Sequence, residues 1–453
     1  MTASSPAEHL IPGEDMVARC RQYTLYEWVA QDAADPMPIV RAKGVYIWDA
    51  AGRKYLDFNS QSVYMNIGHG DERVADAVAD QMRTLASVSP FQATEVRGLL
   101  GEALAAVTPR GLTKSFLTLG GSDANEAALR IARLVTGRHK IITRYRSYHG
   151  STQGTLFASG DPRRWPNESG MGGIVRVQDP YRYRCSWCSR LEGCVMSCLS
   201  SIEEVINLEG PSTIGAIMVE PITGSNGIIV PPDGWLAGLR ELCDRYGLLL
   251  IADEVMSGFG RTGRWFAVDH EEVVPDIMTV GKGITSGYVP LGACIVSDRV
   301  AEFFQRNTLW AGLTYNSHPV GCAAALANLK IYQSDGLIEN SERMGKALLD
   351  GLEKLKVEHP CVGDVRGRGL FTVIELVRDR ETREPLFTFP GPSSPVMSSM
   401  QRSMRERGVV AAMRGSLLFA CPPLCITKEQ IDDGLAAIDA ALGIADAALM
   451  SFA

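Results

Sequence analysis

Short apolar runs rich in β-branched residues recur through the middle of the chain and alternate with segments of helical periodicity. The runs lie at 115–119, 140–144, 214–220, 247–252, 277–280 and 292–296. The segment SDANEAALRIARLVTG predicts a helix that ends at Gly137, and GWLAGLRELCDRYG predicts another that ends at Gly247. Strands that are apolar on both faces and alternate with helices indicate an α/β fold with a mostly parallel sheet covered on both sides.

The pattern changes after residue 320, where a smaller α+β domain is expected. Residues 321–357 have the periodicity of one long helix or two consecutive helices, and VGDVRGRGLFTVIELV favours a strand pair. A helix at 396–407 and a strand at 416–420 follow, and Thr427 with Gln430 can form a capping box before the last helix. We therefore predict three parts, an N-terminal segment that packs with the small domain, a large ligand-binding domain and a C-terminal small domain, at 1–75, 76–330 and 331–453.

Charge and composition exclude several classes of protein. The chain has 453 residues and a net charge of −7, which argues against a sequence-independent nucleic-acid binder because that class needs a basic surface. No apolar run approaches the ~20 residues that a membrane-spanning helix needs. The N-terminus, MTASSPAEHLIPGED, lacks the basic segment and apolar core of a secretory signal, so the predicted location is the cytoplasm.

Eleven cysteines in a chain without an export signal do not predict a disulfide framework. Four of them are close in sequence, in CSWCSRLEGCVMSC: Cys185, Cys188, Cys194 and Cys198. Four thiolates can hold a structural zinc ion, and the alternative is a reduced, cysteine-rich surface loop. The second pair is too widely spaced for a standard zinc ribbon, so we favour the reduced loop and predict no metal.

The first apolar run leads into Gly120, Gly121 and Ser122 and then into a helix. Glycines let a ligand approach the backbone, and the free N–H groups of a helix N-terminus bind anions such as phosphate. The alternative is a tight turn in which Ser122 only caps the helix.

Three other runs end in charged residues. Glu220 follows the third run, Asp253 and Glu254 follow the fourth, and Lys282 stands between two glycines after the fifth. A carboxylate at the end of an apolar strand needs a cation, a cluster of donors or a metal nearby, or it forms an ordinary salt bridge. Burial of a lysine lowers its pKa and makes the amine a nucleophile for carbonyl groups.

Pyridoxal 5′-phosphate needs these three features together: an anion site for its phosphate, a lysine for its aldehyde and an acid for its ring nitrogen. Ligands of open α/β sheets bind at the carboxyl ends of the strands, where all three are expected. A competing motif, GFGRTG at 258–263, matches the dinucleotide fingerprint G-x-G-x-x-G. It does not directly follow a strand or open a helix, so we reject the dinucleotide interpretation.

The sequence resembles the class III (ω-type) aminotransferases from about residue 40 to residue 443. The matching motifs are LGGSDANEAALR, SYHGST, VEPITG, ADEVMSGFGRTG, GKGITSGYVPLGA, LTYNSHPVGCAAA and the C-terminal PPL. The resemblance implies fold type I, with a large pyridoxal phosphate-binding domain and a small α+β domain. It also implies a homodimer or a dimer of dimers with the active site at the subunit interface.

Roles for individual residues follow from the resemblance. Lys282 looks like the Schiff-base lysine that also moves the proton between substrate carbon and cofactor. Asp253 looks like the partner of the pyridinium nitrogen. Gly121 and Ser122 resemble the phosphate-binding residues at the start of the helix.

Other matching positions surround the cofactor. Tyr148 resembles the aromatic that stacks on its ring, with core packing as the alternative, and Val255 resembles the residue on the opposite face. Glu220 is predicted among the cofactor-binding residues. Thr314 resembles the threonine that reaches the phosphate in the neighbouring subunit, whereas Arg261 is similar to an arginine with a structural role.

Substrate contacts are predicted at three positions. Arg414 looks like the mobile arginine that clamps the carboxylate of a keto acid, a task that suits a bidentate guanidinium group, or else it is a surface arginine. In some relatives the glutamate that matches Glu220 pairs with this arginine when no carboxylate is bound. Tyr64 and Phe91 are expected in the walls of the substrate pocket.

The departures from the family pattern narrow the expected substrates. Met256 stands where ornithine- and aminobutyrate-type members usually have glutamine, which with TSGYVPLGA resembles the taurine- and β-alanine-type transaminases. The cysteine-bearing loop resembles a loop of taurine-type members. We expect amino transfer from an ω-amino acid or amine to pyruvate or 2-oxoglutarate. The alternatives are an aminomutase similar to glutamate-1-semialdehyde aminomutase and a catalytically silent scaffold on the same fold.

Overall fold

The computed structural model describes residues 12–168, 172–188, 193–391 and 394–450. The interpretation of the N-terminus as lacking an export signal rests on residues that lie mostly outside these ranges. Over the described ranges, no helix combines the length and apolar character that crossing a bilayer requires.

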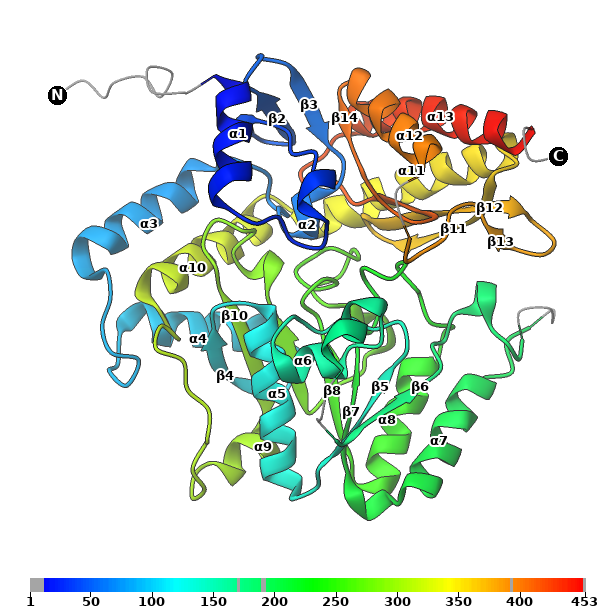
Figure 1. Cartoon of the computed structure of the whole chain (residues 1–453). Helices are drawn as coiled ribbons and strands as arrows, with labels where there is room; N and C mark the ends of the chain where they lie inside the picture. Colours follow the sequence, from blue (N-terminus) through cyan, green and yellow to red (C-terminus); the bar gives the residue numbers. More distant parts are fainter. Residues whose placement is uncertain (1–11, 169–171, 189–192, 392–393, 451–453) are drawn as a thin grey trace.

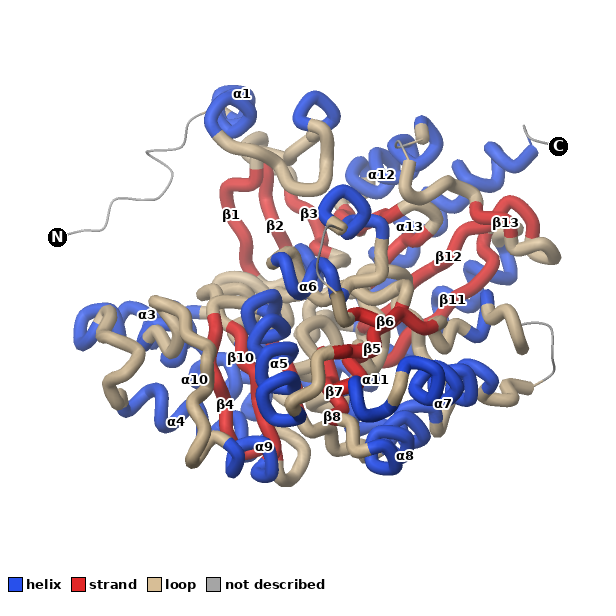
Figure 2. Tube along the Cα trace, turned by 60° about the horizontal axis from the view of Figure 1, so that its bottom comes forward, coloured by secondary structure: helices blue, strands red, loops and turns tan. Residues whose placement is uncertain are grey.

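A seven-stranded sheet, the central sheet, forms the middle layer of the larger part of the molecule, which is the lower part in Figures 1 and 2. Its strands, in spatial order, are β4 (Leu112–Thr118), β10 (Gly292–Ser297), β9 (Ile277–Val280), β8 (Leu249–Asp253), β7 (Ile214–Val219), β5 (Lys140–Arg144) and β6 (Ile174–Val177). Only β10 runs antiparallel to its neighbours. The predicted α/β fold with a mostly parallel sheet is confirmed, and the six predicted strands are present.

Alternate residues of the central strands face two different helix layers. Helix α5 (Gly121–Thr136) covers one face, where its alanines and Ile131 pack with Met218 and Ile251. The other face packs against helices α4, α7, α8 and α10. These span Glu95–Val107, Ser197–Glu209, Trp235–Tyr246 and Pro319–Ser334. Burial on both faces explains the continuously apolar strand sequences.

The predicted helix ends are also present. Helix α5 ends before Gly137, which has φ +67°, and α8 ends before Gly247, which has φ +62°. A left-handed backbone conformation at this position is strained for residues with a Cβ atom, whereas glycine adopts it without strain.

The C-terminal part contains a second sheet in the order β11 (Val362–Arg368), β12 (Phe371–Asp379), β16 (Leu417–Ala420) and β15 (Ala412–Arg414), with β13 (Glu384–Pro385) beside β12. The helices α11 (Leu337–Glu358), α12 (Pro395–Glu406) and α13 (Lys428–Met450) pack on this part. The region 321–357 is therefore two helices, α10 and α11. The capping box precedes α13, because Thr427 N donates to Gln430 Oε1 at 2.9 Å and Gln430 N to Thr427 Oγ1 at 3.4 Å.

The N-terminal segment is joined to the C-terminal part by a small sheet. Strands β1 (Ile39–Lys43), β2 (Tyr46–Asp49) and β3 (Lys54–Asp57) form a meander, and β3 pairs in parallel with β14 (Val409–Val410). The remaining helices are α1 (Gly13–Tyr23), α2 (Ser60–Val63), α3 (Glu72–Leu85), α6 (Gln153–Ala158) and α9 (Asp298–Phe303). Short 3-10 turns lie at Gln31–Ala33, Pro162–Asn167, Arg182–Arg184, Pro211–Thr213, Ala267–Glu271 and Lys282–Ile284.

Candidate active site

A cavity of about 450 Å³ lies where the ends of the parallel strands meet the second sheet, that of β11, β12, β16 and β15. The side chains and backbone that line it come from the start of α5, from the segments after β5, β7, β8 and β9, from β15 and β16, and from the N-terminal segment. They are Glu27, Trp28, Asn59, Ser62, Val63, Gly121, Ser122, Asn125, Tyr148, His149, Gly150, Arg163, Glu220, Ser225, Asp253, Val255, Met256, Lys282, Ala412, Met413, Arg414 and Phe419.

Lys282 follows β9 and lies in this cavity. Its backbone has φ +44°, a left-handed conformation that costs energy for a residue with a Cβ atom. The following Gly283 is required by close packing, because a Cβ there would lie 2.7 Å from Asn66 Nδ2. Burial lowers the pKa of the Lys282 amine, although Asp253 and Glu220 oppose the shift. The amine is therefore brought closer to the neutral, nucleophilic form.

The carboxylate of Asp253 ends β8 and is held by three donors. Its Oδ2 accepts a hydrogen bond from Asn125 Nδ2 at 2.7 Å and lies 2.7 Å from His149 Nδ1, while Oδ1 accepts from Val255 N at 3.0 Å. Asn125 accepts in turn from Thr279 Oγ1 at 2.5 Å. These contacts fix the orientation of a buried negative charge at the cavity wall and satisfy its need for partners.

The N-terminus of α5 opens on the cavity without a side-chain cap from Gly120. The hydroxyl of Ser122 accepts a hydrogen bond from Ser151 N at 3.2 Å. Two glycines keep this end open, since a Cβ on Gly121 would lie 2.6 Å from Val255 Cγ1 and one on Gly150 would lie 2.5 Å from Ser122 Oγ. The first N–H groups of the helix are thus available for an anion.

Glu220 follows β7 and is held by backbone donors. Its Oε1 accepts from Tyr148 N at 3.0 Å and its Oε2 from Gly224 N at 2.7 Å. Burial raises the pKa of this carboxyl, and the nearby charge of Asp253 adds to the shift. The bond from Tyr148 N attaches the VEP segment to the loop that carries Tyr148, whereas the bond from Gly224 N lies within the VEPITG segment.

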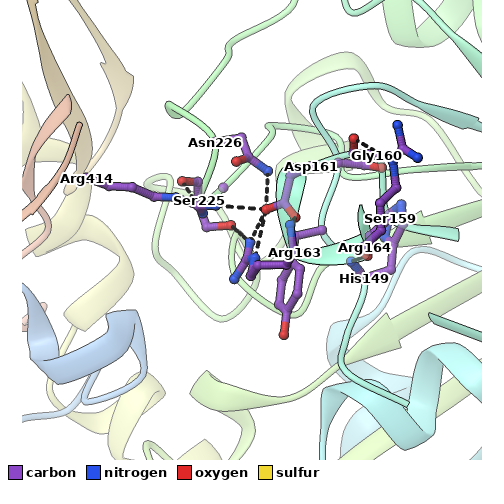
Figure 3. Close-up of polar contacts among 12 residues, drawn as sticks. His149, Ser159, Gly160, Asp161, Arg163, Arg164, Ser225, Asn226 and Arg414 are labelled. Atoms are coloured by element: carbon purple, nitrogen blue, oxygen red, sulfur yellow. Dashed lines mark hydrogen bonds and ion pairs between the residues drawn. The ribbon is translucent and has the colours of Figure 1, made fainter. Parts of the chain in front are cut away.

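Arg414 lies at the end of β15 in the cavity wall, as the sequence predicts, but its partner differs from the pattern of some relatives. Its Nη2 lies 2.9 Å from Asp161 Oδ2, and its Nη1 donates to Ser225 O at 3.1 Å (Figure 3). Glu220 is occupied by backbone donors and does not pair with this arginine. The expected alternative pairing of Arg414 with Glu220 is therefore replaced by a pair with Asp161.

Three of the predicted site residues do not line the cavity of the single chain. Tyr64 is half-buried with its ring against Gly287. Phe91 is 93% exposed in the segment between α3 and α4, and Thr314 is exposed between α9 and α10. The predicted role of Thr314 concerns a neighbouring subunit.

Several residues that the sequence analysis did not single out are part of the site. His149 and Asn125 hold Asp253, Trp28 lines the cavity, and Arg163 places its Cζ 3.4 Å from the centre of the Tyr148 ring. His149 belongs to the motif SYHGST and Asn125 to LGGSDANEAALR, so both could have been found there. Nothing in the sequence marks Trp28 or Arg163.

The four cysteines of the cysteine-bearing loop are not joined by disulfide bonds. Cys188 Sγ and Cys194 Sγ are 3.6 Å apart, well beyond a disulfide bond, and residues 189–192 between them lie outside the described ranges. Burial raises the pKa of Cys188 to about 12 and of Cys198 to about 11, which favours the protonated thiols. Within the described residues, a group of three ligating side chains close enough for one ion occurs elsewhere, at Glu358, His359 and Asp439.

The residues around the cavity fit pyridoxal 5′-phosphate. A nucleophilic lysine, a held carboxylate and the open N-terminus of a helix all face one space, and the glycines beside the helix leave room where a Cβ would collide. Each of the three suits one part of this cofactor: the aldehyde, the ring nitrogen and the phosphate.

Comparison with known proteins agrees with this fit. The family model for class III aminotransferases matches residues 29–442. A taurine–pyruvate aminotransferase of Bilophila wadsworthia is 36% identical over 450 residues, which cover 94% of this chain and 96% of the relative. A putrescine–pyruvate aminotransferase of Pseudomonas aeruginosa is 35% identical over 407 residues, covering 87% and 88%.

A solved structure is also similar along nearly its whole length. It is a taurine:2-oxoglutarate aminotransferase from Bifidobacterium kashiwanohense in complex with pyridoxal phosphate and glutamate. The TM-score is 0.92, the sequence identity is 37%, and the match covers 97% of this chain and 99% of the other. By sequence, fold and the arrangement of its cavity, this chain belongs to the class III aminotransferase family.

Proposed function

We propose that this enzyme transfers an amino group from an ω-amino acid or a simple amine to pyruvate or 2-oxoglutarate, with Lys282 as the lysine that carries pyridoxal phosphate. The family gives the reaction class and the cofactor. The observation that carries the assignment of Lys282 is its position in one cavity with the Asp253 carboxylate and the N-terminus of α5. The relatives that use taurine or putrescine as donor support the substrate class.

The residues of the chain would act in distinct ways on the bound cofactor. When bound, pyridoxal phosphate supplies a ring that withdraws electrons from the substrate carbon. The Asp253 carboxylate, held by His149 and Asn125, stabilises positive charge on the ring nitrogen. The first N–H groups of α5 bind the phosphate.

Lys282 has the second catalytic task in this proposal. Its Nζ would accept the proton from the substrate carbon and pass it to the cofactor. Burial lowers the pKa of this amine, so the neutral form that accepts a proton is more populated at neutral pH than for an exposed lysine.

Arg414 is proposed to bind the carboxylate of the keto acid. It lies in the cavity wall formed by β15, next to the apolar side chains of Met413 and Phe419. Met256 lines the same cavity and offers no strong hydrogen bond. This fits an amine substrate that is recognised by its charge at one end and by apolar contacts along its length.

We also propose a homodimer or dimer of dimers with the active site near the subunit interface. Phe91, Trp310 and Tyr315 are 93%, 71% and 60% exposed, in the segments between α3 and α4 and between α9 and α10. Both segments lie at the β4 edge of the central sheet (Figures 1 and 2). Large exposed apolar side chains grouped on one side are typical of an interface. Light scattering coupled to gel filtration would measure the mass, and a monomer at micromolar concentration would contradict the proposal.

A half-reaction screen tests the function directly. The cofactor-loaded enzyme is mixed with β-alanine, taurine, ornithine, aminobutyrate or an arylalkylamine, and the loss of its cofactor absorbance is followed. Pyruvate or 2-oxoglutarate is then added to restore the absorbance. Loss with one donor and recovery with one keto acid is the expected result.

Two other outcomes would favour the alternatives. Conversion of an amino-aldehyde without any keto acid would favour an aminomutase. A protein that binds no cofactor at all would favour a silent scaffold. The cytoplasmic location stays a prediction, which cell fractionation would check.

A further inference from the structure

The pair between Arg414 and Asp161 is one part of a larger charged cluster at the cavity wall (Figure 3). Asp161 is almost fully buried and caps the short helix that contains Arg163. Within the cluster of Asp161, Arg163 and Arg414, two guanidinium groups share one carboxylate, so the cluster itself has one positive charge in excess. An excess of one charge suits one monoanionic group, such as the carboxylate of a keto acid or the acid group of an ω-amino acid.

Arg163 is fixed by many contacts. Its backbone N donates to Asp161 Oδ1 at 3.0 Å, and its Nε and Nη2 donate to Oδ2 at 2.8 and 2.5 Å. Its Nη2 also donates to Ser225 Oγ at 2.9 Å, and its guanidinium group stacks over the ring of Tyr148. A guanidinium with this many partners stays in place when one ligand enters.

Arg414 is attached far more loosely. It has one contact to Asp161, one to the carbonyl oxygen of Ser225, and a stacking contact 4.6 Å from the centre of the Phe389 ring. Asp161 Oδ2 also receives donors from Arg163 and from Asn226 Nδ2, the latter at 3.2 Å. The oxygen therefore keeps three other donors if Arg414 leaves, and its departure creates no unpaired buried charge.

We propose that Asp161 is a specificity-determining residue that holds Arg414 against the cavity wall and competes with the anionic group of the substrate for it. With a keto acid bound, Arg414 exchanges Asp161 for the substrate carboxylate, while Arg163 keeps its pair with Asp161. With a donor that lacks an acid group, Arg414 remains on Asp161, held against the cavity wall. One pocket thereby binds a keto acid with a carboxylate in one half of the reaction and an amine without an acid group in the other half. The inference rests on the proposed function of Arg414 but concerns binding, which can be measured without turnover.

Asp161 is buried, but its two arginine partners keep its carboxylate charged. Burial alone would raise its pKa, but the hydrogen bonds and charges of Arg163 and Arg414 outweigh burial and hold the pKa below the usual value. Asp161 thus remains an anion at neutral pH and can compete with another anion.

Titration of the cofactor-loaded enzyme with propionate tests the exchange, since propionate has the carboxylate of the substrate and no reactive group. Binding is followed by tryptophan fluorescence, because Trp28 lines the cavity. We expect Asp161→Asn to tighten propionate binding about tenfold and Arg414→Ala to weaken it about tenfold, the factor of one hydrogen bond to a charged group. Propionamide, the uncharged analogue, should bind all variants equally.

The double variant Asp161→Asn/Arg414→Ala shows whether Asp161 acts through Arg414, and the direction of the change in Asp161→Asn separates competition from simple positioning. If Asp161 acts through Arg414, the double variant binds propionate like Arg414→Ala alone. Weaker propionate binding by Asp161→Asn would show that Asp161 only positions the arginine and would overturn the proposal, as would unchanged binding. This result is independent of the donor screen, so tighter propionate binding with no amino transfer would refute the proposed function and leave the exchange intact.

A crystal structure of the unmodified enzyme with propionate covers the case in which Asp161→Asn does not fold. The expected structure has Arg414 on propionate and more than about 4 Å from Asp161, the limit of an ion pair, with Arg163 unmoved. Propionate bound elsewhere, with Arg414 still on Asp161, would contradict the exchange.

Discussion

His149 Nδ1 lies 2.7 Å from Asp253 Oδ2, and no described residue bonds its other ring nitrogen. Because a carboxylate oxygen only accepts, the imidazole donates through Nδ1–H and has its Nε2 free of a proton when it is neutral. His149 and Asn125 therefore hold the same carboxylate oxygen of Asp253, Oδ2. The carboxylate is left with little freedom to turn away from a ring nitrogen in the cavity.

Replacing His149 by alanine is expected to weaken cofactor binding about 10- to 100-fold, because a hydrogen bond to a charged group contributes about 1.5–3 kcal/mol. The dissociation constant is measured from the absorbance of the bound cofactor during titration of the cofactor-free enzyme. His139→Ala is the matched control, since His139 is exposed on the segment before β5. Unchanged affinity in His149→Ala would contradict the role of this histidine.

Lys282→Ala is expected to abolish transamination, by at least about 10⁴-fold, because both the covalent attachment and the proton transfer would be lost. The measurement is the rate of donor-dependent loss of cofactor absorbance. Lys354→Ala on α11 is a control at an exposed lysine. Circular dichroism should show the same fold in both variants, and turnover near the normal rate in Lys282→Ala would exclude the assignment.

Arg261→Leu is expected to destabilise the protein by at least about 3 kcal/mol. The buried guanidinium donates to Pro422 O and Asn66 Oδ1, both at 2.6 Å, so its loss leaves several buried acceptors without a donor. The free energy of unfolding is measured by urea titration. Arg264→Leu in the same loop is the control, because Arg264 is largely exposed and its pair with Glu342 is 3.6 Å long.

His359 is expected to make the stability of the protein depend on pH. Its Nδ1 lies 2.6 Å from Asp446 Oδ2 and its Nε2 lies 2.7 Å from Asp439 Oδ1, which joins the end of α11 to α13. Burial alone would lower the pKa of this imidazole, but the two carboxylates outweigh burial and raise it. A raised pKa means that the stabilisation is complete below the unfolded value of about 6.5 and is lost as the pH rises through the folded value.

The variant His359→Gln should therefore lose about 1–3 kcal/mol at pH 6 and less at pH 9. Urea unfolding at the two pH values measures the difference, with His139→Gln as the control at an exposed histidine. An equal loss at both pH values would show that His359 contributes by packing and not by charge.

The sequence predicts those elements whose environment leaves a periodic pattern. Strands β7, β8 and β9 are buried along their whole length and read as continuous apolar runs. Strand β6 was missed, because it is short, only its last residue is fully buried, and Arg176 interrupts its apolar pattern. Lys282 and Asp253 were found for the same reason as the strands, since each stands directly after an apolar run.

Residues placed by tertiary contacts leave no such pattern. Asp161 and Arg163 lie at the start of a short helix after α6, and only the packing of the second sheet, which contains β15, brings Arg414 to them. Phe91 was expected in the pocket, but the single chain leaves it exposed at the far edge of the central sheet. The role of a side chain that contacts a residue distant in sequence, or a residue of another subunit, can be recognised only when the distant parts are placed together.

The pairing of β3 with β14 has a consequence for synthesis of the chain. Leu56 stands opposite Val409, so the N-terminal meander receives its fourth strand only when almost the whole polypeptide has left the ribosome. Until then the edge of β3 has unpaired backbone groups, the kind of edge that invites pairing with another chain. The central sheet, from β4 to β10, is complete earlier, because all of its strands precede residue 298. Nascent chains arrested before β14 should accordingly depend on chaperones, even though their central sheet is already formed.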